Sequence, residues 1–315
     1  MRITNNMMIS NMVKNLGNNQ SRLSKYQNQL DTGKKISVPS DDPVVAARAL
    51  KLRTDVAKVE QYQKNIGDAT SWLDATDETL GKIGNVLQLV RDKMVQAANG
   101  TNTIGETQKI AVEIKQLKAQ AIHLSNSTYA GRYIFSGFRT DQKLINDDET
   151  SPDYGKFSID VNTNKEKIFY EIGVGDSINI NVAGGDLFNN TGDATAGSDP
   201  SMIAVLDEVI GCMEAGDYKG ISDLLNDSTK LNTIDIQINN VLRARADIGA
   251  RQNRVDLTED RMENDLVNYT DLMSKNEDVD VAETIMNLKN EENVYQASLA
   301  GGARIIQQTL VDFLR

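Results

Sequence analysis

The sequence has little of what catalytic and metal sites are built from. Its 315 residues include one cysteine, Cys212, and one histidine, His123. A single cysteine excludes an intrachain disulfide and a cysteine metal cage, and a single histidine excludes a multi-histidine metal site. Aromatic residues make up only 5% of the chain, which is lean for a compact enzyme. We therefore expect no catalytic residues, no bound metal and no cofactor.

Excess positive charge and long apolar runs are missing as well. The chain has 34 basic and 45 acidic side chains, a net charge of −11, which argues against nucleic acid as a partner. No apolar run approaches the 18 residues of a membrane span, so we expect no membrane insertion. The first residues also lack the apolar stretch of a cleaved signal peptide.

Proline is scarce, and its four positions divide the chain. It occurs only at Pro39, Pro43, Pro152 and Pro200. Because proline disrupts a helix interior, the segments between these positions are free to form long helices. Hydrophobic periodicity predicts helices over 43–99, 106–128, 201–215, 218–226 and 231–275. Alternation predicts strands in 131–138, 157–161, 168–172 and 178–182, with a loop over 184–200. The fold class is therefore mainly α with a small β insert.

Two Asp-Pro steps have the form of helix starts. Asp42 precedes Pro43, and Asp199 precedes Pro200. An aspartate accepts hydrogen bonds from the first free amides of a helix, and proline fits the first helical position. Asp42 and Asp199 are therefore predicted to be helix caps.

Both ends of the chain carry a heptad pattern of apolar residues, which is typical of helices that pack side by side. In the N-terminal arm the pattern is Ile9, Met12, Leu16, Leu23, Tyr26 and Leu30, with Asn19 completing it. In the C-terminal arm it is Val281, Ile285, Leu288, Tyr295, Leu299, Ile306, Leu310 and Phe313. The first arm is rich in asparagine and the second contains Gly301-Gly302, each glycine costing about 1 kcal/mol in a helix. We expect such weak helices to be buried against neighbouring subunits, so these residues form the predicted assembly interface.

The charges of the two ends are complementary. Residues 1–40 carry six basic groups and one acidic group, and residues 276–315 carry three basic and seven acidic groups. Opposite charges favour pairing of the two ends with each other. The predicted domains are terminal coiled-coil arms (1–40 and 277–315), a helical rod (41–139 and 199–276) and an outer β domain (140–198). The segment 140–200 carries 12 acidic and 4 basic residues, so we place it on the outside.

Other candidate sites are weak. His123 lies in a predicted helix, and Cys212 is interpreted as a small apolar residue. The acidic loops at 147–149 and 186–193 do not have EF-hand spacing, so a solvated loop is favoured over a calcium site.

Both terminal regions resemble the bacterial flagellin family. The similarity covers 20–24, 30–36 and the segment 40–50, which reads Ser-Asp-Asp-Pro-Val-Val-Ala-Ala-Arg-Ala-Leu. At the other end it covers 282–288 and 297–314. Within the family, 131–137 (Gly-Arg-Tyr-Ile-Phe-Ser-Gly) and the ending Val-Asp-Phe-Leu-Arg look most like the branch at the hook-filament junction.

The resemblance implies a flagellin-like fold, a long antiparallel rod built from both halves of the chain. It implies a structural adaptor that joins the flagellar hook to the filament, exported unfolded through the flagellar type III apparatus and thus outside the cell. Implied partners are further copies in a ring, the other hook-associated junction protein, flagellin, and a cytoplasmic export chaperone at the C-terminal arm.

Three alternatives stay open. Filament flagellin itself would differ in copy number. A signalling coiled coil would need a membrane span or a sensory partner. An enzyme housed in the insert would lose turnover, with assembly intact, when 140–198 is deleted.

Overall fold

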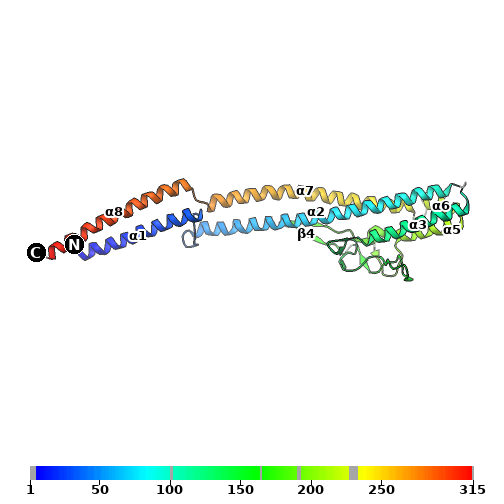
Figure 1. Ribbon diagram of the computed structural model, residues 1–315, viewed down its shortest axis with the longest axis horizontal. Coiled ribbons are helices and arrows are strands. Elements are labelled where there is room, and N and C mark those ends of the chain that lie inside the picture. Colours follow the sequence, from blue (N-terminus) through cyan, green and yellow to red (C-terminus); the bar gives the residue numbers. More distant parts are fainter. Residues whose placement is uncertain (1–4, 100–101, 164, 190–192, 227–232, 314–315) are drawn as a thin grey trace. The chain divides into compact units, whose positions relative to one another are not determined.

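Helices dominate the computed structural model, which describes residues 5–99, 102–163, 165–189, 193–226 and 233–313 (Figure 1). The helices are α1 (Asn5–Thr32), α2 (Pro43–Ala98), α3 (Ile104–Ser125), α4 (Gly184–Phe188), α5 (Ser201–Ala215), α6 (Tyr218–Asn226), α7 (Ile234–Glu277) and α8 (Val281–Phe313). The strands are β1 (Thr128–Tyr129), β2 (Arg132–Tyr133), β3 (Val161–Asn162), β4 (Phe169–Gly173), β5 (Asp176–Asn179) and β6 (Asp193–Ala194). The predicted fold class is confirmed.

The chain forms two compact units. The first comprises residues 1–60 and 264–315, and the second comprises residues 61–263. Helices α2 and α7 contribute to both. The predicted division into arms, rod and β domain assigns roles to segments of the chain, and it stays a prediction.

In the second unit, α2 supplies the central apolar face. Its residues Ile66, Leu73, Leu80, Leu87 and Met94 are spaced seven apart, and none has any exposed surface. Each such side chain contributes about 1.5–3 kcal/mol by leaving water. Helix α7 runs antiparallel beside it, because Arg91 pairs with Asp235 at 2.8 Å and Arg245 pairs with Asp77 at 2.8 Å. A regular heptad in one long helix thus forms the core of this unit.

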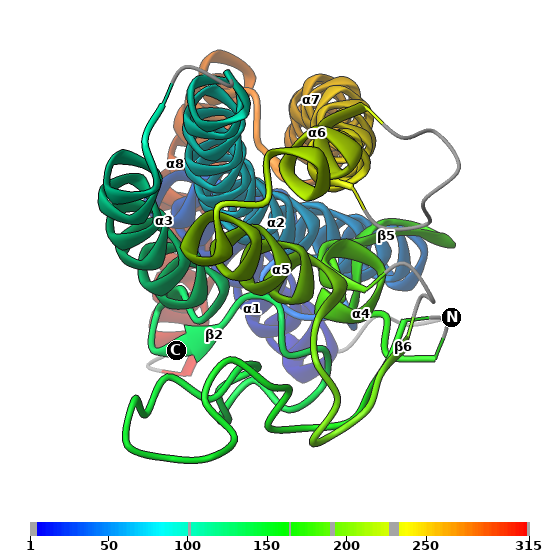
Figure 2. The ribbon, with the colours of Figure 1, turned by 90° about the vertical axis from the view of Figure 1, so that its right-hand side faces the viewer.

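Shorter helices complete the bundle of the second unit. Helix α5 contacts both α3 and α6, as the end-on view shows (Figure 2). Lys118 of α3 is almost buried and pairs with Asp207 of α5 at 2.6 Å. The same ammonium group lies 5.2 Å from the centre of the Tyr154 ring, within range of a cation–π contact. This contact ties the β insert to the helices.

The β insert consists of three antiparallel pairs, β1–β2, β3–β6 and β4–β5. The turn between β1 and β2 is Ala130-Gly131, both with positive φ (48° and 77°), as a two-residue hairpin of this hand requires. The predicted strands are partly wrong. Only Arg132–Tyr133 of 131–138 and only Val161 of 157–161 belong to strands.

The predicted loop over 184–200 is also wrong in part, because it contains α4 and β6. The cause is tertiary packing. Phe188 at the end of α4 is fully buried and meets the ring of Phe135 edge-on, with the two centres 5.5 Å apart. Burial of this aromatic pair fixes a segment whose glycines predict a turn.

The two Asp-Pro steps behave differently. Asp42 Oδ1 accepts hydrogen bonds from the backbone N–H groups of Val44 (2.9 Å) and Val45 (3.1 Å), so Asp42 caps α2. The prediction for Asp199 is wrong. Pro200 itself occupies the cap position of α5, and no side chain bonds there. Pro43 is the first residue of α2, whereas Pro200 precedes the first residue of α5. The Asp199 carboxylate is therefore one residue too far from the free amides of the helix.

Candidate assembly site

The two terminal helices, α1 and α8, pack against each other along the first unit (Figure 1). Asn19 Nδ2 donates a hydrogen bond of 2.9 Å to Ser298 Oγ. Arg22 Nε lies 3.2 Å from Glu291 Oε1. As one sequence number rises the other falls, so the helices are antiparallel. The pairing of oppositely charged ends within one chain, predicted from the sequence, is confirmed.

Helix α1 turns its heptad pattern toward α8. Asn19 is only 7% exposed, and the apolar positions of the pattern are half-buried while their neighbours are exposed. These half-buried residues are Ile9, Met12, Leu16, Leu23, Tyr26 and Leu30. The apolar stripe of this arm is thus partly covered within one molecule.

Helix α8 does not turn its whole apolar pattern toward α1. Thr284 and Gly302 are buried, and Leu288 and Tyr295 are half-buried. The side chains of Val281, Ile285 and Leu299 remain 55%, 44% and 46% exposed. The side chains of Ile306, Leu310 and Phe313 lie outside the described residues. The most buried positions of α8 are therefore small or polar, and part of its predicted apolar stripe stays open.

Gly302 shows why α8 turns this face inward. A Cβ atom added to Gly302 would lie 2.6 Å from the Met12 sulfur, whereas a Cβ on Gly301 would meet nothing within 4 Å. The glycine thus admits a large side chain of α1. Helix α8 runs unbroken through both glycines, so their cost does not end the helix.

The centre of the arm pair is polar. Arg22 Nη2 donates to Asn19 Oδ1 at 2.7 Å, in addition to its ion pair with Glu291. In the part of the chain that the structure describes, the buried Oε2 atom of Glu291 has no hydrogen-bond partner. An unpaired buried polar atom costs about 1–3 kcal/mol. The polar centre therefore favours one register and keeps the isolated pair weak.

Where arms and rod helices meet, one buried carboxylate binds two cations. The Glu277 side chain at the end of α7 is 2% exposed. Arg53 of α2 donates from Nε (2.7 Å) and Nη2 (2.6 Å) to its two oxygens, and Lys34 Nζ lies 3.4 Å away. The hydrogen bonds from Arg53 and the positive charges of Arg53 and Lys34 hold the pKa of Glu277 below its usual value, against the opposing effect of burial.

The next residue extends this ionic cluster. Asp278 accepts from Lys34 Nζ at 2.6 Å and from Ser274 Oγ at 2.5 Å. The bond from Lys34, followed by that from Ser274, lowers the pKa of Asp278, and the bond to Asp278 raises the pKa of Lys34. Backbone bonds join the same segments, Lys35 N to Glu277 O (2.7 Å) and Val279 N to Gly33 O (3.0 Å). The connection between α1 and α2 and the connection between α7 and α8 are thus bonded to each other.

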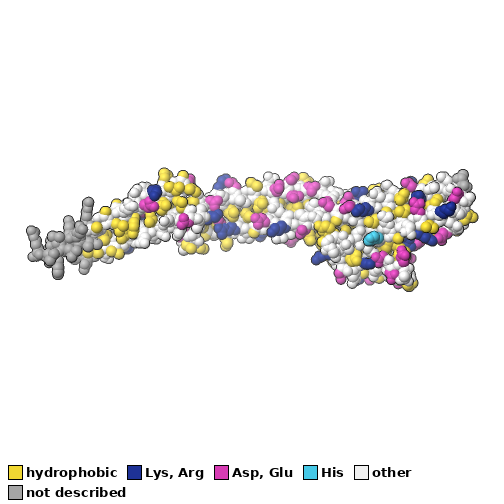
Figure 3. All heavy atoms as spheres, viewed as in Figure 1, with side chains coloured by type: hydrophobic (Ala, Val, Ile, Leu, Met, Phe, Trp, Pro, Cys, Tyr) yellow, Lys and Arg dark blue, Asp and Glu magenta, His cyan; other side chains and the backbone are white. Residues whose placement is uncertain are grey.

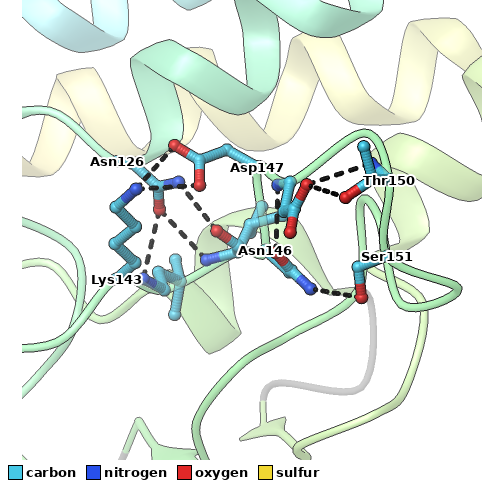
Figure 4. A network of polar contacts seen from close by, with 9 residues as sticks. Asn126, Lys143, Asn146, Asp147, Thr150 and Ser151 are labelled. Atoms are coloured by element: carbon cyan, nitrogen blue, oxygen red, sulfur yellow. Dashed lines mark hydrogen bonds and ion pairs between the residues drawn. The ribbon is translucent and has the colours of Figure 1, made fainter.

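The other sequence candidates lie apart from this region. His123 is exposed on α3 (Figure 3), and Cys212 is half-buried in α5. Polar groups of the loop 143–151 bond to one another and to Asn126, which follows α3 (Figure 4). Lys143 pairs with Asp147 at 2.8 Å, and Asp148 Oδ1 accepts from the backbone and side chain of Thr150. Its carboxylates are therefore used in ordering the loop.

Within the described ranges no group of three or more His, Cys, Asp or Glu side chains could hold a metal ion. None of the helices there has a stretch long and apolar enough for a membrane span.

Comparison with known proteins decides the family. Residues 3–140 match the bacterial flagellin N-terminal helical region, and residues 231–314 match the bacterial flagellin C-terminal helical region. The chain belongs to the bacterial flagellin family. The flagellar hook-associated protein 3 of Escherichia coli K12 is 27% identical over 95% of both chains. The flagellin of Bacillus subtilis 168 is 28% identical over 98% of this chain and 97% of that one.

A solved structure supports the fold. The flagellar junction protein FlgL from Legionella pneumophila superposes with a TM-score of 0.55 at 16% identity, covering 75% of this chain and all of that chain. At this identity the likeness concerns the fold alone. Taken with the family models and relatives, it identifies the chain as a structural protein of the bacterial flagellum, and α1 and α8 as its flagellin-type terminal helices.

Sequence reasoning missed the cluster of Glu277, Arg53 and Lys34. Glu277 is one of 45 acidic residues and belongs to no motif. The only signal was its place at a predicted helix end, close to a break. The exposure of Val281, Ile285 and Leu299 was also missed, because apolar periodicity marks a stripe without saying which of its positions a partner covers.

Proposed function

We propose that this protein is an adaptor subunit that joins the flagellar hook to the filament. The observation that carries the proposal is the resemblance to hook-associated protein 3 of E. coli over 95% of both chains. A structural role fits the described surface, where the notable feature is an incompletely covered pair of terminal helices. The partners in this proposal are further copies in a ring, the other hook-associated protein below, and flagellin above.

The assembly interface is proposed to be the apolar heptads of the two arms. Its residues are Ile9, Met12, Leu16, Leu23, Tyr26 and Leu30, with Val281, Ile285, Leu288, Tyr295, Leu299, Ile306, Leu310 and Phe313. Support comes from the exposed side chains of Val281, Ile285 and Leu299, which a monomer leaves in water. Burying them against neighbours stabilises the assembly by about 25 cal/mol for each Å² removed from water.

Export in an unfolded state is part of the proposal. A chain with one cysteine has no intrachain disulfide to hold it folded, and arms with a polar centre and glycines order only at some cost. A cytoplasmic chaperone is proposed to hold the C-terminal arm before export. The exposed apolar side chains of α8 give such a chaperone a surface to cover.

Filament flagellin is the second candidate. It is favoured by the 28% identity to the B. subtilis flagellin over nearly the whole of both chains. The two roles differ in abundance and in position, since a junction subunit is needed in few copies and a filament subunit in many.

Electron microscopy of a deletion strain tests the proposal. The expected result is hooks without filaments and unpolymerised flagellin in the medium, with filaments restored by the native gene. If the strain instead lacks flagellin in both filament and medium, the chain is the filament subunit. Filaments of normal length and number on the deletion strain would refute both roles.

Limited proteolysis tests the weakness of the arms. A dilute monomer should lose its ends and leave a resistant middle of about 40–280, as mass spectrometry of the fragments would show. The same chain within isolated flagella should resist digestion at both ends. Equal protection of the arms in monomer and assembly would contradict assembly-coupled ordering.

A further inference from the structure

Two apolar surfaces of the first unit are left open beside the ionic cluster of Glu277. One is a groove formed by the segment between α1 and α2 together with the first turns of α2. The other is the outer side of the first turns of α8. Their chemistry and position make the two surfaces complementary.

The groove has a volume of about 450 Å³. Its lining includes Ile36, Val38, Pro39, Ala47 and Leu50. Leu50 is 69% exposed and Val38 is 47% exposed. Prolines and alanines keep the floor rigid and shallow, so the groove fits bulky side chains presented by another element.

The open side of α8 presents such side chains. Val281, Ile285 and Met286 are 55%, 44% and 64% exposed, and they lie within the first two turns of the helix. In the same turns of α8, Thr284 is only 4% exposed. Three large apolar side chains are therefore displayed on a rigid helix that is already held from the other side.

The charges around the two surfaces are opposite. Apart from Lys34 and Arg53, which are already paired with Glu277, residues 33–53 carry three basic and two acidic groups, a net charge of +1. Residues 280–292 carry four acidic groups and one basic group, a net charge of −3. Opposite potentials favour contact between groove and helix, whereas two α8 surfaces repel each other.

The two surfaces lie on opposite sides of the first unit. In Figure 1 the start of α8 is at the upper edge, and the segment before α2 is at the lower edge. Figure 3 shows hydrophobic side chains gathered at both places. One chain therefore cannot fill its own groove with its own α8 without unfolding the arm pair, but a second copy can.

We infer that the groove of one copy receives the start of α8 from the next copy, with Val281, Ile285 and Met286 against Leu50 and its neighbours. Such a contact joins different surfaces of identical chains, so it repeats around a ring or helix. The inference rests on the proposed assembly function, and it names which faces meet.

Cysteine cross-linking tests the contact in assembled flagella. Leu50→Cys and Ile285→Cys chains are co-expressed in a strain lacking the native chain, and isolated flagella are oxidised. The expected product is a disulfide-linked dimer of twice 34.7 kDa, present only when both variants are mixed. A chain carrying both changes should give a ladder of higher multimers, because each copy then links to two neighbours.

A matched control replaces Ile285→Cys by Leu257→Cys, which alters an apolar residue of α7 that is 72% exposed. This pair should give no dimer beyond the background from Cys212. Dimers from Ile285→Cys alone would overturn the inference, because they show α8 meeting α8. Filaments without any cross-link would also overturn the inference, while leaving the adaptor role intact. Normal filaments on the strain that lacks the chain would instead refute the role itself.

Charge exchange gives a second readout that needs no oxidation. Lys51 follows Ala47 by four residues, on the same side of α2, and Glu283 precedes Met286 by three on α8. Lys51→Glu and Glu283→Lys should each reduce the fraction of cells with filaments, and the two changes in one chain should restore it. A double variant no better than the single variants would overturn the proposed docking.

Discussion

The ion pair between Glu277 and Arg53 permits a quantitative prediction, Glu277→Gln. Glutamine keeps the size of the side chain and one acceptor oxygen but removes the charge. The native carboxylate accepts two bonds from Arg53, at 2.7 and 2.6 Å, and charge-assisted bonds of this kind are worth about 1.5–3 kcal/mol. Arg53 is 60% exposed and returns to water, so screening lowers the net loss to about 1–2 kcal/mol.

Hydrogen exchange measures this loss of stability in the two helices that the ion pair joins. Amides at the start of α2 (44–60) and the end of α7 (266–277) should exchange about 5- to 30-fold faster in the variant at neutral pH. Glu259→Gln, an exposed position on the same helix, is the matched control and should change nothing. A double-mutant cycle with Arg53→Gln isolates the pair, and a coupling energy near zero would refute the role assigned to Glu277.

The pH dependence of stability tests independently whether the charge of Glu277 is stabilising. The pKa of Glu277 lies below its usual value, about 4.5, because Arg53 and Lys34 favour the ionised form. The stabilisation is therefore complete above that usual value and is lost as the pH falls through the lowered pKa. Native and variant chains should differ by a constant amount from pH 8 to about pH 5, and the difference should shrink and vanish as the pH falls below the usual value and through the lowered pKa. A difference that persisted unchanged in acid would show that packing, not charge, is responsible.

Four further substitutions test the caps and the arm contact. Asp42→Ala should cost α2 about 1 kcal/mol, seen as faster exchange of its first amides, whereas Asp199→Ala should leave α5 unchanged because that residue makes no cap. Gly301→Ala should gain about 1 kcal/mol of helix stability. Gly302→Ala should gain less, because its Cβ would press on the Met12 sulfur. Circular dichroism of the full chain would rank the two glycine variants; a larger gain at Gly302 would contradict the close approach.

The sequence predicted the elements with regular periodicity. The heptads of α2 gave its length and its buried face, because Leu73, Leu80 and Leu87 recur at the spacing that brings side chains to one side of a helix. The opposite charges of residues 1–40 and 276–315 gave the pairing of α1 with α8. The small β insert was predicted less well, because strands of two residues leave no pattern and α4 depends on the burial of Phe188 against Phe135.

The sequence alone therefore determined that long helices dominate, that the two ends of the chain pair, and that the terminal regions resemble flagellin. The first two properties follow from local periodicity and net charge, which are additive along the chain, and the resemblance follows from the sequence motifs at both ends. Only the tertiary structure decided that Leu299 stays exposed while Gly302 packs on Met12 of α1, and that Glu277 meets Arg53. Such choices depend on which side chains fit together in three dimensions, and residues more than 200 positions apart leave no local trace of their contact.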